Sequence, residues 1–497
     1  MVFCGEAPGK DEVLNREGFV GPAGKVLQKI IYTSGLSWSD VGRTNVVKRA
    51  PDGGFDSEHF LSTFYTTTRV NRKKVVAPTD ELLAWYQALA VELAEQAPNV
   101  VVACGQEALK ALCEVSGISK YRGSVLPSTL VKGLKVVPLM HPSWIQRKRQ
   151  WQELYISGRI VAEKVLPQSR SKELSYLEWD ELLAPTINQV ADCIRYLIGE
   201  RIPYALDIET RAGGVACVGL AYRPFDGVDR AICIPIQTTT GPYFTLEEEA
   251  SVWGLLTELL ATNPNLVGQN IFYDLAWLRE YGVLPSGLVD IMLLFQRMYP
   301  ELPKGLAFLN MLYNDIPYYK DDGKTWGKNE PDARLWSYNI KDCVATLRVY
   351  FALCELARDQ FKQEAGIYQD YTAKIMPIAF EMQVLGLDAD VAGVELARGV
   401  LSRELETIRL RLDQLSQGEL VVLPGNSKIT DQQKHKFLYK TLGLPVKRKQ
   451  STQRVTAEED AIVELMITHP KLEVLKCILA EGKFFKALSS YIDIEWA

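Results

Sequence analysis

Short apolar runs alternate with longer amphipathic segments along about the first 165 residues of the chain. Four of these runs have the length of buried strands: residues 2–4, 44–48, 99–104 and 134–140. Helical patterns lie between them, and strands that alternate with helices predict a parallel sheet with helices on both faces. Functional side chains of such sheets gather at the carboxyl ends of the strands, at or near which Glu6, Asn45 and His141 lie.

A second group of apolar runs begins at residues 204–206 and continues at 214–222 and 231–236. Three consecutive strands followed by helical patterns predict a mixed sheet. Asp207 and Glu209 end the first run, and alternate residues of a strand face the same way, so the two carboxylates point together. A divalent cation between them would remove their repulsion. The alternative is a pair of solvated acids at an exposed strand end.

Two later stretches add acids on separate elements. Asn270 and Asp274 follow the apolar run 266–267 and open a helical pattern. Tyr338 and Asp342 lie four residues apart in another helical pattern, so they share one face of that helix. The chain therefore offers four acids and a tyrosine that a fold can bring together.

Composition limits the classes of protein to consider. A length of 497 residues corresponds to about three domains, and 47% hydrophobic residues are ample for folded cores. The net charge of −5 gives no global basic footprint, although a local basic cleft can still hold phosphates. Nine cysteines without a Cys-x-x-Cys motif indicate a reducing cytoplasm, with no disulfide framework and no obvious zinc site. No apolar run approaches the roughly 20 residues that span a bilayer, so no membrane partner is expected.

The acidic motifs resemble those of DEDD-type 3′–5′ exonucleases, in the variant that has tyrosine in the third motif. The order and spacing are most similar to the proofreading domain of family A DNA polymerases, and residues 303–306 and 317–320 look like those of phage relatives. The resemblance implies a ribonuclease H-like mixed sheet over residues 176–365 and binding of single-stranded or frayed DNA 3′ ends.

The same resemblance implies a role for each motif residue. Two Mg²⁺ or Mn²⁺ ions are expected on a set of four carboxylates: Asp207, Glu209, Asp274 and Asp342. Tyr338 is expected to orient the attacking water. Asn270 is expected to brace the second motif on the substrate side without binding metal.

Four segments near the N-terminus resemble uracil-DNA glycosylases, closest to the bacterial family-four branch: residues 5–9, 18–21, 44–48 and 141–143. The resemblance implies that Phe19 stacks on a flipped-out uracil and that Asn45 reads its polar edge. His141 would stabilise the departing uracil anion, and Glu6 would shape the floor of the pocket. A parallel α/β/α domain over residues 1–166 is expected, with a linker at 167–175.

That glycosylase family usually holds an iron–sulfur cluster on four cysteines. Two of them would precede Val2, and the segments at which the other two are expected, residues 48–51 and 82–86, contain no cysteine. No iron–sulfur cluster is therefore expected. A polar insertion of residues 52–74 stands in its place and is expected to be disordered or to touch DNA.

The last part of the chain, residues 366–497, is helical in pattern, with a long helix expected over 394–417. Residues 376–388, 426–428 and 442–445 resemble the segment that leads into a family A polymerase and its thumb. The acidic motifs of the palm and the fingers helix are absent. The expected fold class is thus α/β multidomain, with a glycosylase-like sheet, an exonuclease sheet and a helical thumb segment.

The expected function is a proofreading 3′–5′ exonuclease within the N-terminal part of a phage-like polymerase, with an N-terminal domain that can excise uracil. Two alternatives stay open. One is a glycosylase whose exonuclease-like domain only holds DNA, and the other is a non-catalytic clamp for a separate polymerase subunit. Expected partners are DNA and the remaining polymerase part or replisome proteins, in the bacterial host cytoplasm if a phage encodes the chain.

Overall fold

The first sheet of the computed structural model contains four parallel strands, as the apolar runs predict. They lie in the order β2, β1, β5, β7, and β6 pairs antiparallel with β7 at the edge. The strands are β1 (Val2–Gly5), β2 (Gly42–Asn45), β5 (Val100–Cys104), β6 (Leu126–Pro127) and β7 (Lys135–Leu139). Phe3 and Val102 enter one hydrophobic cluster, whereas Cys4 and Val101 enter another. Both faces are buried, which explains why the runs are continuously apolar.

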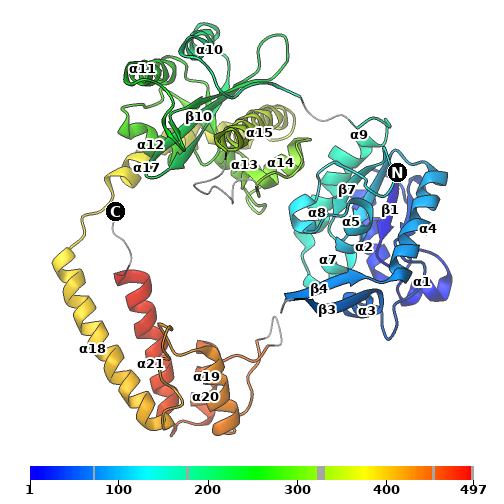
Figure 1. The fold of residues 1–497 in the computed structure, drawn as a ribbon, viewed down its shortest axis with the longest axis vertical. Coiled ribbons are helices and arrows are strands. Elements are labelled where there is room, and N and C mark those ends of the chain that lie inside the picture. Colours follow the sequence, from blue (N-terminus) through cyan, green and yellow to red (C-terminus); the bar gives the residue numbers. More distant parts are fainter. Residues whose placement is uncertain (71–72, 175–177, 322–330, 450–453, 494–497) are drawn as a thin grey trace. The chain divides into compact units, whose positions relative to one another are not determined.

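Helices cover both faces of this sheet (Figure 1). Leu27 and Ile30 join the cluster that contains Phe3, while Leu89 and Leu109 join the cluster that contains Cys4. The helices involved are α2 (Pro22–Thr33), α4 (Asp80–Gln96) and α5 (Gln106–Cys113). The expected parallel α/β/α arrangement is confirmed.

The insertion at residues 52–74 contains regular structure. Helix α3 (Ser57–Phe64) buries Phe60 and Phe64 in the hydrophobic cluster that contains Cys4. Strands β3 (Tyr65–Val70) and β4 (Lys73–Pro78) then form an antiparallel hairpin. Phe60 and Phe64 lie four residues apart, so this helix carries an apolar anchor within an otherwise polar segment.

The second sheet is mixed, as predicted. Its order is β15-β14-β9-β10-β11-β8, in which β9, β10 and β11 are antiparallel neighbours and the other pairs are parallel. The strands are β8 (Asp180–Leu182), β9 (Tyr204–Arg211), β10 (Gly214–Tyr222), β11 (Arg230–Pro235), β14 (Leu266–Gly268) and β15 (Leu288–Asp290). Tyr204 and Leu206 on β9 are buried, which sets Asp207 at the edge of the core.

Helix α15 (Asp332–Asp359) packs on β9, β10 and β11 (Figure 1). Gly219 on β10 allows this close approach. A Cβ atom there would lie 2.3 Å from Asn339 Oδ1 and 2.6 Å from Cys343 Sγ, both on α15. The helix carries Tyr338 and Asp342, so the missing side chain at Gly219 helps to bring these residues close to β9.

The predicted linker at 167–175 is tied to the N-terminal domain over the part that the structure describes. Helix α9 (Leu166–Gln168) enters it. Asn99 Nδ2 donates to the carbonyl of Ser169 over 2.7 Å, and the buried Lys135 donates to the carbonyl of Ser171 over 2.7 Å. Ser169 and Ser171 are therefore hydrogen-bonded to the N-terminal domain, and residue 175 lies outside the described residues.

The chain divides into two compact units, residues 1–384 and 385–497. The structure describes residues 1–70, 73–174, 178–321, 331–449 and 454–493. The predicted start of a third domain at residue 366 lies inside the first unit, because the Tyr368 side chain is buried and its hydroxyl accepts the Asp290 N–H over 2.8 Å. The division into domains at 166, 176 and 366 stays a prediction.

The second unit is helical around its own core, as expected. Its main helices are α18 (Val391–Ser416), α20 (Glu459–Thr468) and α21 (Glu473–Ala487). They bury a cluster that includes Leu412, Leu465 and Leu475.

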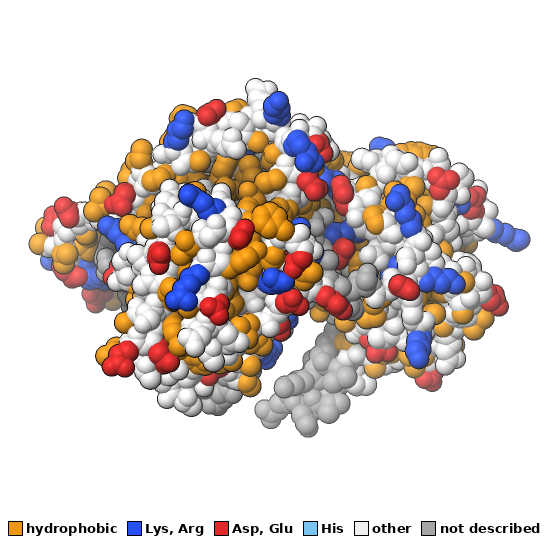
Figure 2. All heavy atoms as spheres, turned by 90° about the horizontal axis from the view of Figure 1, so that it is seen from above, with side chains coloured by type: hydrophobic (Ala, Val, Ile, Leu, Met, Phe, Trp, Pro, Cys, Tyr) orange, Lys and Arg blue, Asp and Glu red, His pale blue; other side chains and the backbone are white. Residues whose placement is uncertain are grey.

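Among the described residues, no helix combines the length and the apolar character that crossing a membrane requires. On the face drawn in Figure 2, basic and acidic side chains are interspersed.

Candidate active sites

Three carboxylates meet beside the second sheet. Asp207 and Glu209 project from the same face of β9, and Asp342 comes from α15. One oxygen from each lies within 4.8 Å of the others. Asp342 is 5% exposed, so the group sits at the boundary of the core. Three hard oxygen donors at this spacing fit Mg²⁺ or Mn²⁺ better than zinc.

Burial and mutual repulsion favour the protonated forms of Asp207 and Glu209. Burial, followed by the charge of Asp342, raises the pKa of Glu209 to about 8. The same two causes raise the pKa of Asp207 well above its ordinary value. A divalent ion replaces such protons when it binds, because ligands have to be deprotonated. The electrostatics of the cluster therefore fit a cation site.

Asp274 lies next to this group but is held differently from the other three acids. It is on α12 (Phe272–Glu280), and its Oδ1 accepts the N–H of Ile208 over 2.9 Å, between the two acids of β9. Burial raises the pKa of Asp274 to about 7. Among the described residues, the group with converging oxygens is Asp207, Glu209 and Asp342, so a ligand role for Asp274 stays a prediction.

Asn270 shapes the turn that leads into α12. Its backbone is left-handed, with φ of 57°, which asparagine tolerates better than most residues. The N–H groups of Asn270 and Ile271 donate to the two carboxylate oxygens of the buried Asp290, over 3.2 and 3.1 Å. These backbone contacts anchor the turn to Asp290, and a bracing role for Asn270 stays a prediction.

Two residues that the acidic motifs do not include bind Asp342. The Tyr319 hydroxyl donates to Asp342 Oδ1 over 2.5 Å, and Lys320 Nζ donates to the same oxygen over 2.6 Å. Lys320 Nζ also lies 3.1 Å from the hydroxyl of Tyr338. The only signal for them in the sequence was the likeness of residues 317–320 to phage relatives, which assigned them no role.

Asn339 is a further residue that sequence reasoning missed. It lies between Tyr338 and Asp342 on α15, and its Nδ2 donates to the Asp207 carboxylate over 2.9 Å and to the Asp207 carbonyl over 3.0 Å. These bonds fix the orientation of a carboxylate that a metal would use, which is what residues behind metal ligands commonly do.

A cavity at the carboxyl ends of the first sheet brings the glycosylase-like residues together. Phe19, Asn45 and His141 all line it, together with Arg147 of α7 (Pro142–Lys148). Asn45 ends β2, and His141 follows β7. This is the edge at which ligand sites of parallel sheets form.

Gly5 lies behind two residues that line this cavity. A Cβ atom at Gly5 would lie 2.3 Å from Asn45 Oδ1 and 2.8 Å from the ring of Phe19, so both side chains rest against bare backbone. Glu6 is not one of the described residues that line the cavity. Burial, followed by the charge of Glu107, raises the pKa of Glu6 to about 7. A role for Glu6 at the pocket floor stays a prediction.

The hydrogen bonds of His141 define its protonation. The residue caps α7, and its Nδ1 accepts the backbone N–H of Ser143 over 3.1 Å. Burial, with the charge of Arg147 as the second cause, lowers the pKa of His141 to about 4. At neutral pH the ring is therefore neutral. We assign its proton to Nε2, because Nδ1 accepts the Ser143 N–H and lies 2.7 Å from the Ser143 hydroxyl, which can also donate to it. A neutral Nε2–H group can donate to an oxygen on which negative charge develops.

This geometry predicts that His141 stays neutral between about pH 5 and 8, because its pKa lies below the ordinary value near 6.5. The chain has 4 histidines, so side-chain nitrogen NMR can resolve them, with His141→Gln used to assign the signal. We expect an Nε2–H tautomer throughout this range. Protonation of His141 near pH 6.5 would contradict the assignment.

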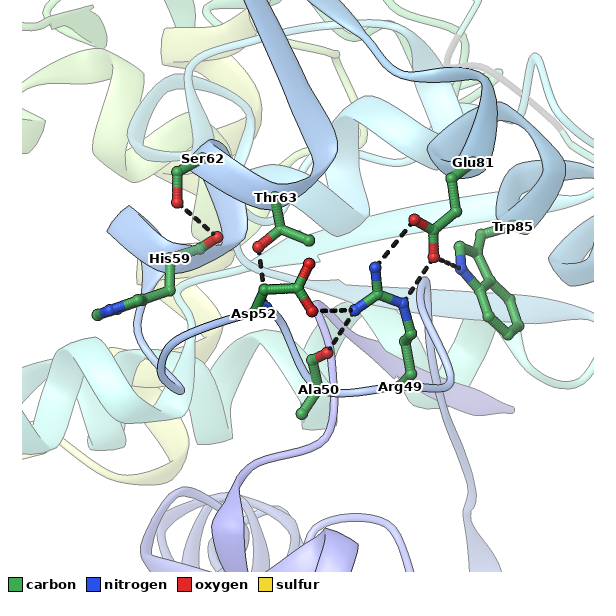
Figure 3. A network of polar contacts seen from close by, with 8 residues as sticks. All are labelled: Arg49, Ala50, Asp52, His59, Ser62, Thr63, Glu81 and Trp85. Atoms are coloured by element: carbon green, nitrogen blue, oxygen red, sulfur yellow. Dashed lines mark hydrogen bonds and ion pairs between the residues drawn. The ribbon is translucent and has the colours of Figure 1, made fainter.

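Arg49 joins the two segments at which the resemblance places cluster cysteines (Figure 3). Its guanidinium donates to both carboxylate oxygens of Glu81, over 2.6 and 2.9 Å, and to Asp52 over 3.0 Å. Trp85 Nε1 donates to Glu81 over 3.3 Å. A bidentate ion pair thus links the loop after β2 to the start of α4. The absence of an iron–sulfur cluster stays a prediction, which iron analysis of anaerobically purified protein tests.

Two regions of the chain match known families. Residues 1–157 match the uracil DNA glycosylase superfamily, and residues 199–356 match a 3′–5′ exonuclease family. A type-4 uracil-DNA glycosylase of Archaeoglobus fulgidus is 32% identical over 163 residues, which cover 32% of this chain and 72% of that protein. A DNA polymerase of Bacillus phage SP01 is 24% identical over 459 residues, which cover 84% of this chain and 46% of the polymerase.

One solved structure, the POL domain of Pol1 from M. smegmatis in complex with DNA primer-template and dNTP, aligns with a TM-score of 0.44. Its identity is 17%, and the alignment covers 62% of this chain and 48% of that one. The chain thus spans less than half of either polymerase. The resemblances to a family-four glycosylase, a 3′–5′ exonuclease and a phage polymerase are confirmed by the family and relative matches.

Proposed function

The chain belongs to the uracil-DNA glycosylase superfamily through residues 1–157, and it carries a 3′–5′ exonuclease domain in residues 199–356. From the exonuclease domain we propose that it removes nucleotides from DNA 3′ ends. The observation that carries this proposal is the convergence of Asp207, Glu209 and Asp342 to within 4.8 Å. Single-stranded or frayed 3′ ends are the substrate, and Mg²⁺ is the metal. The chain acts as the N-terminal part of a phage-type family A polymerase.

The roles of the residues follow from their positions. Asp207, Glu209 and Asp342 would hold two divalent ions, with Asp274 as the fourth ligand. Bound ions supply an acidified water and neutralise charge on the leaving oxygen. Asn339 keeps the Asp207 carboxylate oriented. Tyr338 lies one helical turn before Asp342, where its hydroxyl can orient the attacking water.

A 5′-labelled single strand tests this proposal. With Mg²⁺, the label should move through a ladder of shorter products, and 5′-mononucleotides should be released. EDTA should stop the reaction. Digestion that survives chelation would place the chemistry elsewhere. Metal-dependent binding of DNA without digestion would favour the clamp alternative.

A second activity, excision of uracil, is favoured by the cavity that Phe19, Asn45 and His141 line. Phe19 stacks the flipped base, Asn45 reads its polar edge, and the Nε2–H of His141 stabilises the departing anion. The base has to leave the helical stack to reach such a pocket. The reaction needs no metal, so it should run in EDTA on a single strand that contains uracil. Absence of an abasic product would mean that this domain only binds DNA.

The remaining assignments complete the proposal. We assign the glycosylase-like domain to residues 1–166, the exonuclease domain to 176–365 and the start of the thumb to 366–497. The rest of a polymerase and replisome proteins are the proposed partners besides DNA. The proposed location is the cytoplasm of a bacterial host.

A further inference from the structure

A short segment delivers Tyr319 and Lys320 to the carboxylate cluster. This segment, residues 314–321, follows α14 (Leu306–Tyr313). The Tyr319 side chain is buried, and its ring packs edge-on against Tyr338 with centroids 5.8 Å apart. Lys320 Nζ lies 5.0 Å from the centre of the Tyr338 ring. The segment therefore contacts both the tyrosine and the aspartate of the third motif.

The glycosylase-like domain holds this segment at its beginning. Lys164 is 4% exposed, and its ammonium donates to the carbonyl of Asn314 and, over 2.8 Å, to Asp315 Oδ1. A lysine is rarely buried so far without partners, because desolvating an unpaired charge is costly. These contacts join residues 150 positions apart in the chain.

The same domain also holds the end of the segment. Ser124 Oγ accepts the N–H of Tyr318 over 3.3 Å, and the rings of Tyr121 and Tyr318 meet edge-on with centroids 5.7 Å apart. Lys120 pairs with Asp321 over 2.7 Å at the surface. Contacts from one domain thus bracket the two residues that bind the catalytic carboxylate of the other.

We propose that the glycosylase-like domain is a structural part of the exonuclease site, because it holds residues 314–321 so that Tyr319 and Lys320 fix the position of Asp342. This inference rests on the proposed exonuclease function. Lys320 is a positioning residue that places one positive charge beside three carboxylates. Its ammonium competes with divalent ions for Asp342, so the glycosylase-like domain sets the metal affinity of the exonuclease site.

Metal binding by the full chain without DNA tests this coupling. Lys320→Met should bind Mn²⁺ more tightly than the wild type, by about 10-fold, because the competing charge is gone. Lys164→Met should change the Mn²⁺ affinity by about 2-fold or more. A change of about 2-fold corresponds to the smallest interaction free energies that are typical of coupled residues. In the Lys320→Met background, Lys164→Met should have no further effect. Calorimetry or manganese EPR gives the four affinities of this cycle.

Two further variants guard against a trivial loss of structure. Lys120 and Lys132 are both exposed lysines of the glycosylase-like domain, but only Lys120 pairs with the segment. Lys120→Met should change Mn²⁺ affinity in the same direction as Lys164→Met, and Lys132→Met should not change it. Melting curves identify any variant that fails to fold, and Lys120→Met then carries the test because its ion pair is exposed.

Additive effects of Lys164→Met and Lys320→Met, or equal Mn²⁺ affinities for wild type and Lys320→Met, would overturn the inference. Its failure is distinct from failure of the proposed function. A wild-type chain that binds Mn²⁺ but degrades no DNA refutes the exonuclease proposal. The coupling between Lys164 and Lys320 can still be measured from the four Mn²⁺ affinities in that case. A chain that degrades DNA with uncoupled affinities refutes only this inference.

Discussion

Asp207→Ala combined with Glu209→Ala should lower the rate of nucleotide release from DNA 3′ ends by at least about 10³-fold. Bound ions contribute several kcal/mol of charge stabilisation to such a reaction, and each 1.36 kcal/mol corresponds to about tenfold in rate. Both acids project from β9 into the same cluster, so one double variant removes two of its three converging oxygens. Single-turnover digestion of a 5′-labelled strand in Mg²⁺ measures the loss.

The fold should survive this change. Burial and repulsion raise the pKa of both acids, so their removal relieves unfavourable charge, which offsets the loss of the hydrogen bond from Asn339 to the Asp207 carboxylate. In EDTA the double variant should melt at or above the temperature of the wild type. Asp192→Ala combined with Glu200→Ala on α10 (Ile187–Glu200) is the matched control, because both acids are exposed and lie outside the motifs. Digestion that persists in the Asp207/Glu209 variant would show that the site is wrong.

His141→Ala should slow uracil excision by about 10²- to 10³-fold, the loss that follows when one donor to a developing anion is removed. The structure makes His141 a neutral Nε2–H donor, since its Nδ1 accepts the Ser143 N–H and its pKa is lowered to about 4. The assay uses a single strand with one uracil in EDTA, which silences the exonuclease, and alkali then reveals abasic sites.

His59→Ala is the control for this second prediction. His59 is a half-buried histidine of the same domain that pairs with Asp56 over 2.7 Å and does not line the cavity. Its replacement should leave excision unchanged. If His141→Ala works as fast as the wild type, His141 has no part in uracil release.

Local periodicity was enough to predict which residues of the carboxylate cluster share a face. Asp207 and Glu209 share a face because strand side chains alternate, and Tyr338 and Asp342 share a face because they are four apart on α15. The apolar runs likewise predicted both sheets, since a strand buried on two faces must be apolar throughout. These features depend on sequence distances of a few residues.

The contacts that complete the sites depend on distant parts of the chain. Lys320 reaches Asp342 only because residues 314–321 are held by Lys164 and Ser124, and no periodic pattern links these positions. The close approach of α15 to β10 depends on Gly219. In the sequence alone, a glycine within a strand indicates only a less stable strand. The spacing of Phe60 and Phe64, four residues apart, is typical of a helix, but the polar residues around them made the segment resemble a loop.

The most direct test of the account is the position of metal ions in crystals of the full chain soaked in Mn²⁺. Anomalous diffraction should show two peaks about 3.5–4 Å apart, in contact with Asp207, Glu209 and Asp342, and with Asp274 at the fourth ligand position. Soaking in a chelator should remove both peaks. If Mn²⁺ sites appear elsewhere while these carboxylates bind none, the proposed two-ion exonuclease site is contradicted.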